Sequence, residues 1–553
     1  MNRINQPLRS AHWRLNTPRQ TRSNLAIALA FASMLAAVLI IWTGAPAHAQ
    51  TSPFGKAIAQ AAAKDPVILA FYKSRAFKSF WTGNSDRQRR NAFIEALKSA
   101  PAHGLPRGRY DANKVKKTLT GLKSAKARGV LEVETTRKFL LYARDIQTGI
   151  LEPRRIDKNM TLKPPRRDPL KTLQAFAKSS PAGFLKSLPP KTADYQRLLK
   201  EKVRMERIVG RGGWGATVKA KKLKPGDSNG SVQVMRKRLA VMGYKSSGSS
   251  PKYDASLEKV VKIFQQDHGL NADGVAGGQT IAALNVSAGN RLMQVVIGLE
   301  RLRWLNKPLG KRHILVNEAA FMAYVMDNGK PTLTTRVVVG LPGKWRTPEF
   351  EKTMTHMIIN PSWFVPGSIA GGEYLPLLQK DADALTRQGI VMTDASGQKV
   401  DPTSIDYSQY SKKDFPFSLR QPPSAANALG KVKFMFPNKH AIYLHDTPAK
   451  SLFGKDIRAY SHGCVRVHKP MELAYTLLSK QSANPKALFD GYLAGGEEVQ
   501  VNLKTPVPIY LVYRTAWVSE KGRPNYRADG YKVDRLVFKA LSKAGVALRG
   551  VKS

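Results

Sequence analysis

Residues 460–467 read Tyr-Ser-His-Gly-Cys-Val-Arg-Val, and residues 441–445 upstream read Ala-Ile-Tyr-Leu-His. The upstream run is apolar and strand-like, and it ends in His445. A basic loop separates it from the later run, so a strand–loop–strand return can bring the two together. These two stretches therefore predict neighbouring strands that carry a histidine and a cysteine to one place.

Cys464 is the only cysteine among the 553 residues, so it cannot form a disulfide within the chain. Such a thiol is either an inert buried side chain or one retained for its reactivity. Two histidines lie nearby and a glycine directly precedes it, which favours reactivity.

Composition indicates a folded chain of two or three domains with an anionic partner. The length exceeds that of one ordinary core. The formal net charge is +51, and so large an excess implies nucleic acid, a polyanionic cell-wall polymer or anionic lipid headgroups as the partner.

The N-terminus helps to choose among these partners. Residues 1–24 are rich in arginine and lack acidic side chains, and residues 25–42 are uncharged and apolar. Ala47-His48-Ala49 has the small-x-small pattern of a cleavage site. Residues 1–49 are therefore predicted to be a signal peptide or an inner-membrane anchor, which directs the rest of the chain to the periplasm. This location excludes chromosomal nucleic acid as a partner.

Changes in periodicity divide the remainder into a multidomain α+β fold. Residues 54–217 predict a helical domain with a scaffold role, and residues 218–230 look like a polar linker. Residues 228–287 predict a three-helix bundle with Asp254 as an N-cap. From residue 312 strand-like runs dominate, and Asp327-Asn328-Gly329-Lys330 predicts a type I′ hairpin turn.

The three-helix segment resembles the peptidoglycan-binding module of wall hydrolases and transpeptidases. The resemblance rests on apolar helix positions and on a Gly/Asp turn, namely Val234-Met235-x-x-x-Leu239, Met242-Gly243-Tyr244, Phe264-Gln265-x-x-His268-Gly269-Leu270 and Asp273-Gly274-x-x-Gly277-x-x-Thr280. The alternative is that this segment is a generic three-helix spacer.

The chemistry expected around Cys464 follows from its neighbours. A peptide carbonyl is a weak electrophile, and thiolate is the strongest nucleophile that side chains offer near neutral pH when an imidazole or backbone dipoles assist it. Gly463 lets the backbone pass close to a substrate, and N–H groups near Cys464 can then face a developing oxyanion.

Residues 440–467 resemble the active-site motif of the L,D-transpeptidase catalytic domain, in which a His precedes a variable loop and Ser/Thr-His-Gly-Cys. The nearer resemblance is to the large periplasmic subgroup of Gram-negative bacteria, on the motifs Asn360-Pro361-Ser362-Trp363-Phe364-Val365-Pro366, Asn427-Ala428-Leu429-Gly430, Phe436-Pro437-Asn438, Ile442-Tyr443-Leu444-His445-Asp446-Thr447-Pro448 and Thr515-Ala516-Trp517. One departure is residues 420–426, which replace the usual Pro-Gly pair and bear on the fit of the donor stem.

This resemblance implies a mainly-β catalytic domain at residues 312–505 with an inserted capping subdomain at about 360–440. Residues 506–553 are expected to form a C-terminal extension that packs on the scaffold and catalytic domains. The implied catalytic residues are Cys464 as nucleophile, His445 as general base, and His462.

The resemblance also implies a set of residues around the substrate. Ser461 and His462 shape the pocket, and Gly463, Cys464 and Tyr443 offer oxyanion contacts. Arg466 is a candidate for binding a substrate carboxylate, since its fork matches that geometry, with a structural ion pair as its alternative. Trp363 on the cap covers the donor peptide. Asp446 either orients His445 or caps a turn, and His440 and His468 are taken as ordinary surface residues.

The implied reaction joins two peptidoglycan stem peptides in a 3→3 cross-link through a Cys thioester, with release of D-alanine and without metal or organic cofactor. Water as acceptor gives carboxypeptidase action, and a protein amine gives attachment of an outer-membrane protein. Carbapenems are expected to acylate the same thiol. The expected partners are peptidoglycan stem peptides and glycan, and also an anionic membrane surface.

Four alternatives stand beside this interpretation. Cys464 could be an inert core residue, or a zinc ligand together with His445 and His462, although these supply only three ligands. The chain could be a non-catalytic wall-binding scaffold. A papain-like peptidase is a further alternative, but such enzymes place the Cys before the His.

Overall fold

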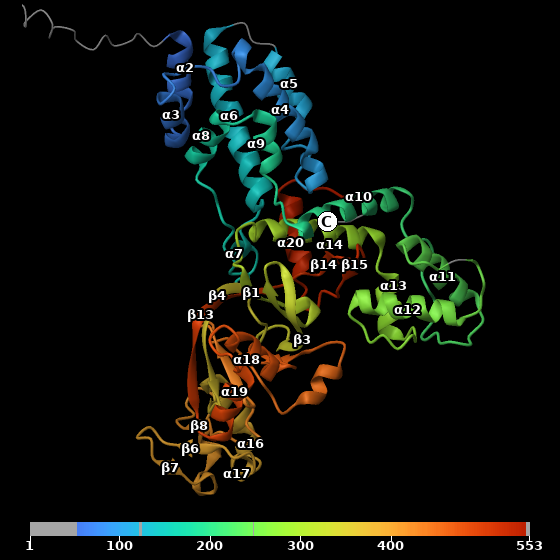
Figure 1. The fold of residues 1–553 in the computed structure, drawn as a ribbon, viewed down its shortest axis with the longest axis vertical. Coiled ribbons are helices and arrows are strands. Elements are labelled where there is room, and N and C mark those ends of the chain that lie inside the picture. The colour runs from blue at the N-terminus through green and yellow to red at the C-terminus, as the bar shows by residue number, and fades with distance from the viewer. Residues whose placement is uncertain (1–51, 121–123, 247, 549–553) are drawn as a thin grey trace, which may run out of the picture.

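The computed structural model describes residues 52–120, 124–246 and 248–548, arranged as bodies that follow one another along a long axis (Figure 1). The predicted signal or anchor segment, residues 1–49, lies outside the described residues. Within the described part, helices long and apolar enough to span a bilayer are absent.

The N-terminal body is helical, as the sequence predicts. Proline follows a Ser or Asp N-cap at the start of four of its helices, a pairing that satisfies a free backbone N–H and presets the first helical φ. Its core is a cluster of buried aromatic rings that includes Trp81, Phe139 and Phe176. The helices are α2 (Pro53–Ala61), α3 (Pro66–Lys73), α4 (Arg87–Ser99), α5 (Ala112–Thr120), α6 (Ala125–Thr148), α8 (Pro169–Lys178) and α9 (Pro181–Ser187).

A second core joins the helical body to the rest of the chain. It combines α10 (Ala193–Gly210) and α14 (Ala288–Trp304) with the C-terminal residues, which form the hairpin β14–β15 (Ala516–Val518, Pro524–Tyr526) and α20 (Val533–Lys543). The C-terminal extension therefore begins after residue 512 and not at 506, because the strand that ends at Val512 still pairs within the large sheet.

The three-helix module is formed by α11 (Gly230–Met242), α12 (Ala255–His268) and α13 (Gly278–Asn285). The predicted cap on α12 is confirmed, since the Asp254 carboxylate accepts a hydrogen bond from Leu257 N at 2.8 Å. The segment expected to be a polar linker belongs to the module instead, because Val218 and Leu223 are buried in its core and Leu223 pairs with Ala276. The module also touches the catalytic domain, where Asp456 accepts from Asn271 N at 2.8 Å.

The β-rich domain predicted at residues 312–505 is a sheet that closes on itself. Its strand order is β11-β3-β12-β10-β9-β4-β13-β1-β2, and β2 pairs in turn with β3. The β2–β3 turn is type I′ as predicted, with φ of 50° at Asn328 and 82° at Gly329. The strands are β1 (Arg312–Asn317), β2 (Met322–Asp327), β3 (Lys330–Gly340), β4 (Phe350–Ile359), β9 (Val432–Met435), β10 (Leu444–His445), β11 (Ala459–Ser461), β12 (Val465–Val467) and β13 (Val499–Val512).

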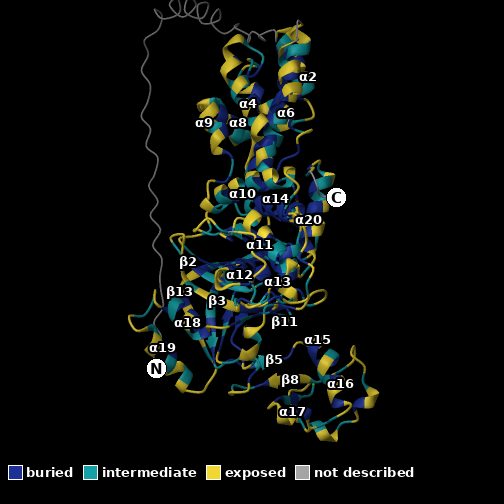
Figure 2. Cartoon of the chain, turned by 90° about the vertical axis from the view of Figure 1, so that its right-hand side faces the viewer, coloured by how far each residue is buried: buried dark blue, intermediate teal, exposed yellow. Residues whose placement is uncertain are grey.

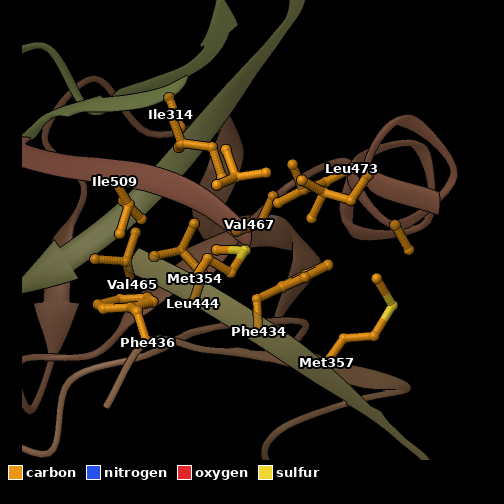
Figure 3. Close-up of a cluster of buried hydrophobic side chains, with 14 of the residues drawn as sticks. Ile314, Met354, Met357, Phe434, Phe436, Leu444, Val465, Val467, Leu473 and Ile509 are labelled. Atoms are coloured by element: carbon orange, nitrogen blue, oxygen red, sulfur yellow. The ribbon is translucent and has the colours of Figure 1, made fainter. Parts of the chain in front are cut away.

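Apolar side chains from these strands fill the interior of the barrel (Figure 3). Two helices, α18 (Pro470–Leu478) and α19 (Pro485–Ala494), pack against it and extend the same core. Many buried residues lie along the strands of the barrel, and exposed residues gather in the loops and on the outer faces of the helices (Figure 2). The core thus holds the strands in fixed register and leaves one end of the barrel free to carry a site.

The cap is an insertion between β4 and β9 with a small sheet and core of its own. It is shorter than the expected range of about 360–440, because β9 pairs with both β4 and β10 in the barrel. Its sheet has the order β5-β8-β6-β7, made of β5 (Trp363–Phe364), β6 (Val391–Thr393), β7 (Lys399–Val400) and β8 (Ser418–Gln421), with α15 (Gly367–Ile369), α16 (Leu375–Leu378) and α17 (Ala384–Arg387) beside it.

Candidate active site

Two short parallel strands carry the predicted cysteine and histidine. β10 and β12 pair so that Leu444 lies opposite Val465 and His445 opposite Arg466. Leu444 and Val465 point into the barrel core (Figure 3). Because side chains alternate along a strand, His445 and Arg466 lie on the other face, and Tyr443 and Cys464, which directly precede β10 and β12, line the same cavity. The fold thus gathers four of the predicted residues on one surface.

That surface forms the floor of a cavity of about 660 Å³, and the cap forms its roof. The barrel contributes Tyr443, His445, Ser461, His462, Cys464 and Arg466 to its walls. The cap contributes mainly apolar and aromatic side chains, namely Trp363, Phe364, Pro366, Ile369, Tyr374 and Leu377. The cavity has the size and the lining of a site for an extended peptide.

The Cys464 thiol is half-buried and donates to the carbonyl oxygen of Ala441 at 3.6 Å. Burial raises the pKa of Cys464 to about 11, although the Tyr443 side chain and the charge of Arg466 act in the opposite direction. The resting sulfur is therefore protonated at neutral pH and needs a base to become a nucleophile.

The His445 imidazole is oriented by the backbone. Its Nδ1 hydrogen bonds to the carbonyl oxygen of Asp446. A carbonyl only accepts, so Nδ1 carries the proton and Nε2 keeps its lone pair. Burial, together with the neighbouring Arg466, lowers the pKa of His445 to about 3. The ring is therefore a neutral base with one nitrogen available.

Asp446 both orients His445 and caps turns, because its backbone carbonyl does the first and its carboxylate the second. Its carboxylate accepts from its neighbour Thr447 N at 2.7 Å, from Lys431 N at 2.9 Å and from the Lys450 ammonium. It therefore fixes two turns, whereas the carbonyl oxygen orients His445.

The turn before Cys464 is fixed by an internal network. Ser461 Oγ donates to the carbonyl oxygen of Cys464 and accepts from Gly463 N at 3.2 Å. Gly463 has φ of 120°, and its carbonyl oxygen accepts from Thr347 Oγ1 at 2.8 Å. The Gly463 N–H is thus engaged within the turn and does not face the cavity as an oxyanion donor, because the Ser461 hydroxyl takes it. Tyr443 and the Cys464 N–H are left for that role.

His462 and Trp363 belong to the boundary with the cap. The His462 ring contacts Trp345 edge to face at 4.6 Å, and its Nε2 hydrogen bonds to Glu373 of the cap. Trp363 lines the cavity from β5, 6.3 Å from the ring of Tyr374. The structure thus places His462 between barrel and cap, and no hydrogen bond joins it to Cys464 in the described part of the chain.

Arg466 has no acidic partner within ion-pair distance among the described residues, and its Nε is buried without a hydrogen bond. It lies next to His445 on the floor of the cavity. A guanidinium left unpaired in this position is suited to an incoming carboxylate. Within residues 52–120, 124–246 and 248–548, groups of three or more His, Cys, Asp or Glu side chains that could hold a metal ion are absent.

Several side chains at the site escaped prediction. Trp345 and Glu373 line the cavity, and Thr347 supports the turn before Cys464. His440, taken as a surface residue, also lines the cavity. Trp345 and Thr347 carried a weak local signal, since they sit in a Gly-Lys-Trp-Arg-Thr stretch at the end of a strand. Glu373 and His440 carried none.

The fold and this site define a β-barrel domain in which a cysteine thiol and a histidine imidazole line one cavity beneath an inserted cap. Comparison with known families matches residues 311–509 to the L,D-transpeptidase catalytic domain. Residues 66–201 match a scaffold domain, and residues 228–284 match a "Putative peptidoglycan binding domain". Residues 311–509 are thus similar to the L,D-transpeptidase catalytic domain, and the two matches ahead of them cover separate domains.

A relative from Haemophilus influenzae, named "Putative L,D-transpeptidase", is 33% identical over 248 residues, which cover 45% of this chain and 49% of that protein. The chain thus spans about half the length of the curated relative it matches.

Among solved structures, an L,D-transpeptidase from Xylanimonas cellulosilytica is similar at 13% identity with a TM-score of 0.17, covering 53% of this chain and 98% of that one. An L,D-transpeptidase from Mycobacterium smegmatis has 14% identity and a TM-score of 0.18, covering 36% of this chain and 58% of that one.

Proposed function

We propose that this protein is a peptidoglycan L,D-transpeptidase that forms 3→3 cross-links through a thioester on Cys464. One observation carries the proposal. His445, whose Nδ1 is held by the carbonyl oxygen of Asp446, and the Cys464 thiol line one peptide-sized cavity under the cap. The resting charges of the pair suit general-base activation, in which the thiol loses its proton only as it attacks.

In the first step His445 Nε2 takes the thiol proton while Cys464 Sγ bonds to the carbonyl carbon of the third stem residue. The tetrahedral oxyanion faces Tyr443 and the Cys464 N–H. When it collapses, the C–N bond to D-alanine breaks and the leaving amine receives the proton from His445. A thioester remains, and Arg466 is available to hold a carboxylate of the donor stem.

In the second step the amine of an acceptor stem attacks the thioester carbon. It loses a proton to His445, the C–S bond breaks, and the proton returns to the sulfur. With water in place of the amine, the same two steps give carboxypeptidase action. Arrival of the amine at the thioester before water therefore decides whether a cross-link forms.

The other domains support action on a polymer outside the inner membrane. The match to a peptidoglycan-binding domain and the net charge of +51 fit a chain that holds anionic wall material, with an anionic membrane surface as a further partner. The proposed location is the periplasm.

Intact-mass analysis tests the chemistry, because the chain has one cysteine and so one site for a thioester. Incubation with a disaccharide tetrapeptide should add the mass of the donor less D-alanine, and an amine acceptor should remove it as a cross-linked dimer. Cys464→Ala is the matched control and should gain no mass. A chain that binds sacculi while neither form releases D-alanine would instead be a wall-binding scaffold.

A further inference from the structure

A second cavity of about 670 Å³ adjoins the active-site cavity, with which it shares His440. One wall is the strap that leads from α7 (Pro153–Ile156) toward α8, and the other is the barrel around the start of β4. The strap is fixed to the barrel, because Thr161 N donates to Glu349 O at 2.8 Å and Glu349 N donates to Asn159 O at 2.7 Å. These two backbone hydrogen bonds therefore hold the two walls of the cavity together.

The charges that line this cavity do not cancel. Its two carboxylates are each held by a cation from outside the cavity: Glu152 pairs with Arg166, and Glu351 pairs with Lys307 at 2.6 Å. Four cations in its lining, by contrast, form no ion pair within the described residues, namely Arg154, Lys163, Lys352 and Lys439. The cavity thus presents unpaired positive charge from both walls, which favours an anionic ligand.

His440 connects this cavity to the active site, since it lines both. Its Nε2 is buried without a hydrogen-bond partner. The pKa of His440 is lowered by burial and then by the nearby Lys439, Arg154 and Lys352, so the ring is neutral at pH 7. The next residue, Ala441, contacts Cys464 Sγ through its carbonyl oxygen at 3.6 Å. The inner end of the basic cavity is thus one residue from the reacting sulfur.

We propose that this basic cavity is the acceptor subsite, where Lys352 and Lys439 on the barrel and Arg154 and Lys163 on the strap bind the carboxylates of the acceptor stem. The inference rests on the proposed function. A stem peptide carries free carboxylates at its end, and its amine must reach the thioester from outside the donor's cavity. His440, which lines both cavities, lies on that path.

Binding to a blocked enzyme tests the subsite apart from turnover. Alkylation of the single cysteine with a maleimide fills the donor cavity and prevents chemistry. The probe is a disaccharide tripeptide, whose stem carries free carboxylates and lacks the D-alanine that the first step expels. Its affinity should fall about tenfold in the blocked double variant Lys352→Ala/Lys439→Ala, as expected for the loss of two exposed charge contacts. Both lysines are exposed, so folding should be preserved, and thermal melting checks this.

Lys539→Ala, which removes an exposed charge from α20, is the matched control and should bind the probe as the parent does. The same probe with its carboxylates amidated should bind weakly to all forms. In the unblocked double variant, the ratio of cross-linked to hydrolysed product should also fall about tenfold, because water then competes better for the thioester.

Equal affinity of the double variant and the control, or of the acid and amidated probes, would refute the subsite. Loss of binding to anionic lipid vesicles with unchanged tripeptide binding would refute it too and assign the charges to a membrane. Failure of the proposed function is a distinct result: the unsubstituted chain then forms no thioester, whatever the blocked enzyme binds.

Discussion

Replacing His445 with Gln removes the base while a polar side chain is retained, and its effect on the pH dependence of thiol chemistry can be worked out. The parent pair is a thiol with a pKa of about 11 beside an imidazole with a pKa of about 3. Between these two pKa values the thiol is protonated and the imidazole is neutral, and general-base attack requires both of these states. The rate of acylation should therefore be nearly independent of pH from about pH 5 to pH 9.

Without the imidazole, only free thiolate can react. With a pKa of about 11, about one Cys464 sulfur in ten thousand is ionised at pH 7. The free energy needed to ionise it at that pH is therefore about 5 kcal/mol. A positioned base contributes about a hundred- to ten-thousandfold. His445→Gln should therefore lose activity by a factor in that range at pH 7, and its rate should then rise about tenfold for each unit of pH.

The assay is the rate of mass gain on Cys464, measured from pH 5 to pH 10 with the tetrapeptide donor and separately with iodoacetamide. His468→Gln is the matched control, because His468 lies outside the cavity that the site residues line. If His445→Gln keeps the parental rate and a flat profile, the imidazole does not activate this thiol and the reasoning fails.

Further outcomes follow from individual contacts. Gly463→Ala places a Cβ 3.0 Å from Ile442 Cδ1, at a residue whose φ is 120°. The rate of acylation should therefore fall at least tenfold, while thermal melting shows that the chain still folds. An unchanged rate would contradict the role given to this turn. Arg466→Met should raise KM for donors with free carboxylates more than for amidated donors, and an equal change for both would argue against carboxylate binding. Burial and the nearby Asp529 carboxylate raise the pKa of Asp534 to about 7. The protonated Asp534 therefore contributes fully to the free energy of unfolding below about pH 4, and this contribution is lost as the pH rises to about 7. The loss is about 4 kcal/mol at most. Asp534→Asn should flatten the corresponding fall in Tm, and an unchanged slope would exclude Asp534 as its cause. The affinity for isolated sacculi should fall as the salt concentration rises, because salt screens the attraction between the positive chain and anionic wall material. An affinity that does not depend on salt would contradict this role of the net charge.

Local sequence was sufficient for much of the fold. The Asn328-Gly329 turn, the Asp254 cap and the change from helical to strand periodicity near residue 312 each depend on residues a few positions apart. Backbone sterics and capping act over that range, so the signal is present in any short window. The motif around Cys464 was readable for the same reason, since alternation along two short strands places its side chains on one face.

The interior of the site depended on contacts that no short window contains. Glu373 reaches His462 across 89 residues, and Thr347 reaches Gly463 across 116. The Gly463 N–H looked free from sequence, but the Ser461 hydroxyl folds back onto it once the turn is formed. Hydrogen bonds of this kind are set by the angle at which strands and cap meet, and packing decides that angle.

The order of residues along the chain names the candidate reacting groups, because Cys464 is the one cysteine and His445 ends a strand-like run shortly before it. Folding then sets the protonation of these two side chains, since burial shifts both pKa values, and it supplies the residues around them. The basic cavity shows this most clearly, because its walls come from a strap near residue 160 and a barrel strand near residue 350. Charges so far apart in the chain make one electrostatic surface only after folding has brought them together.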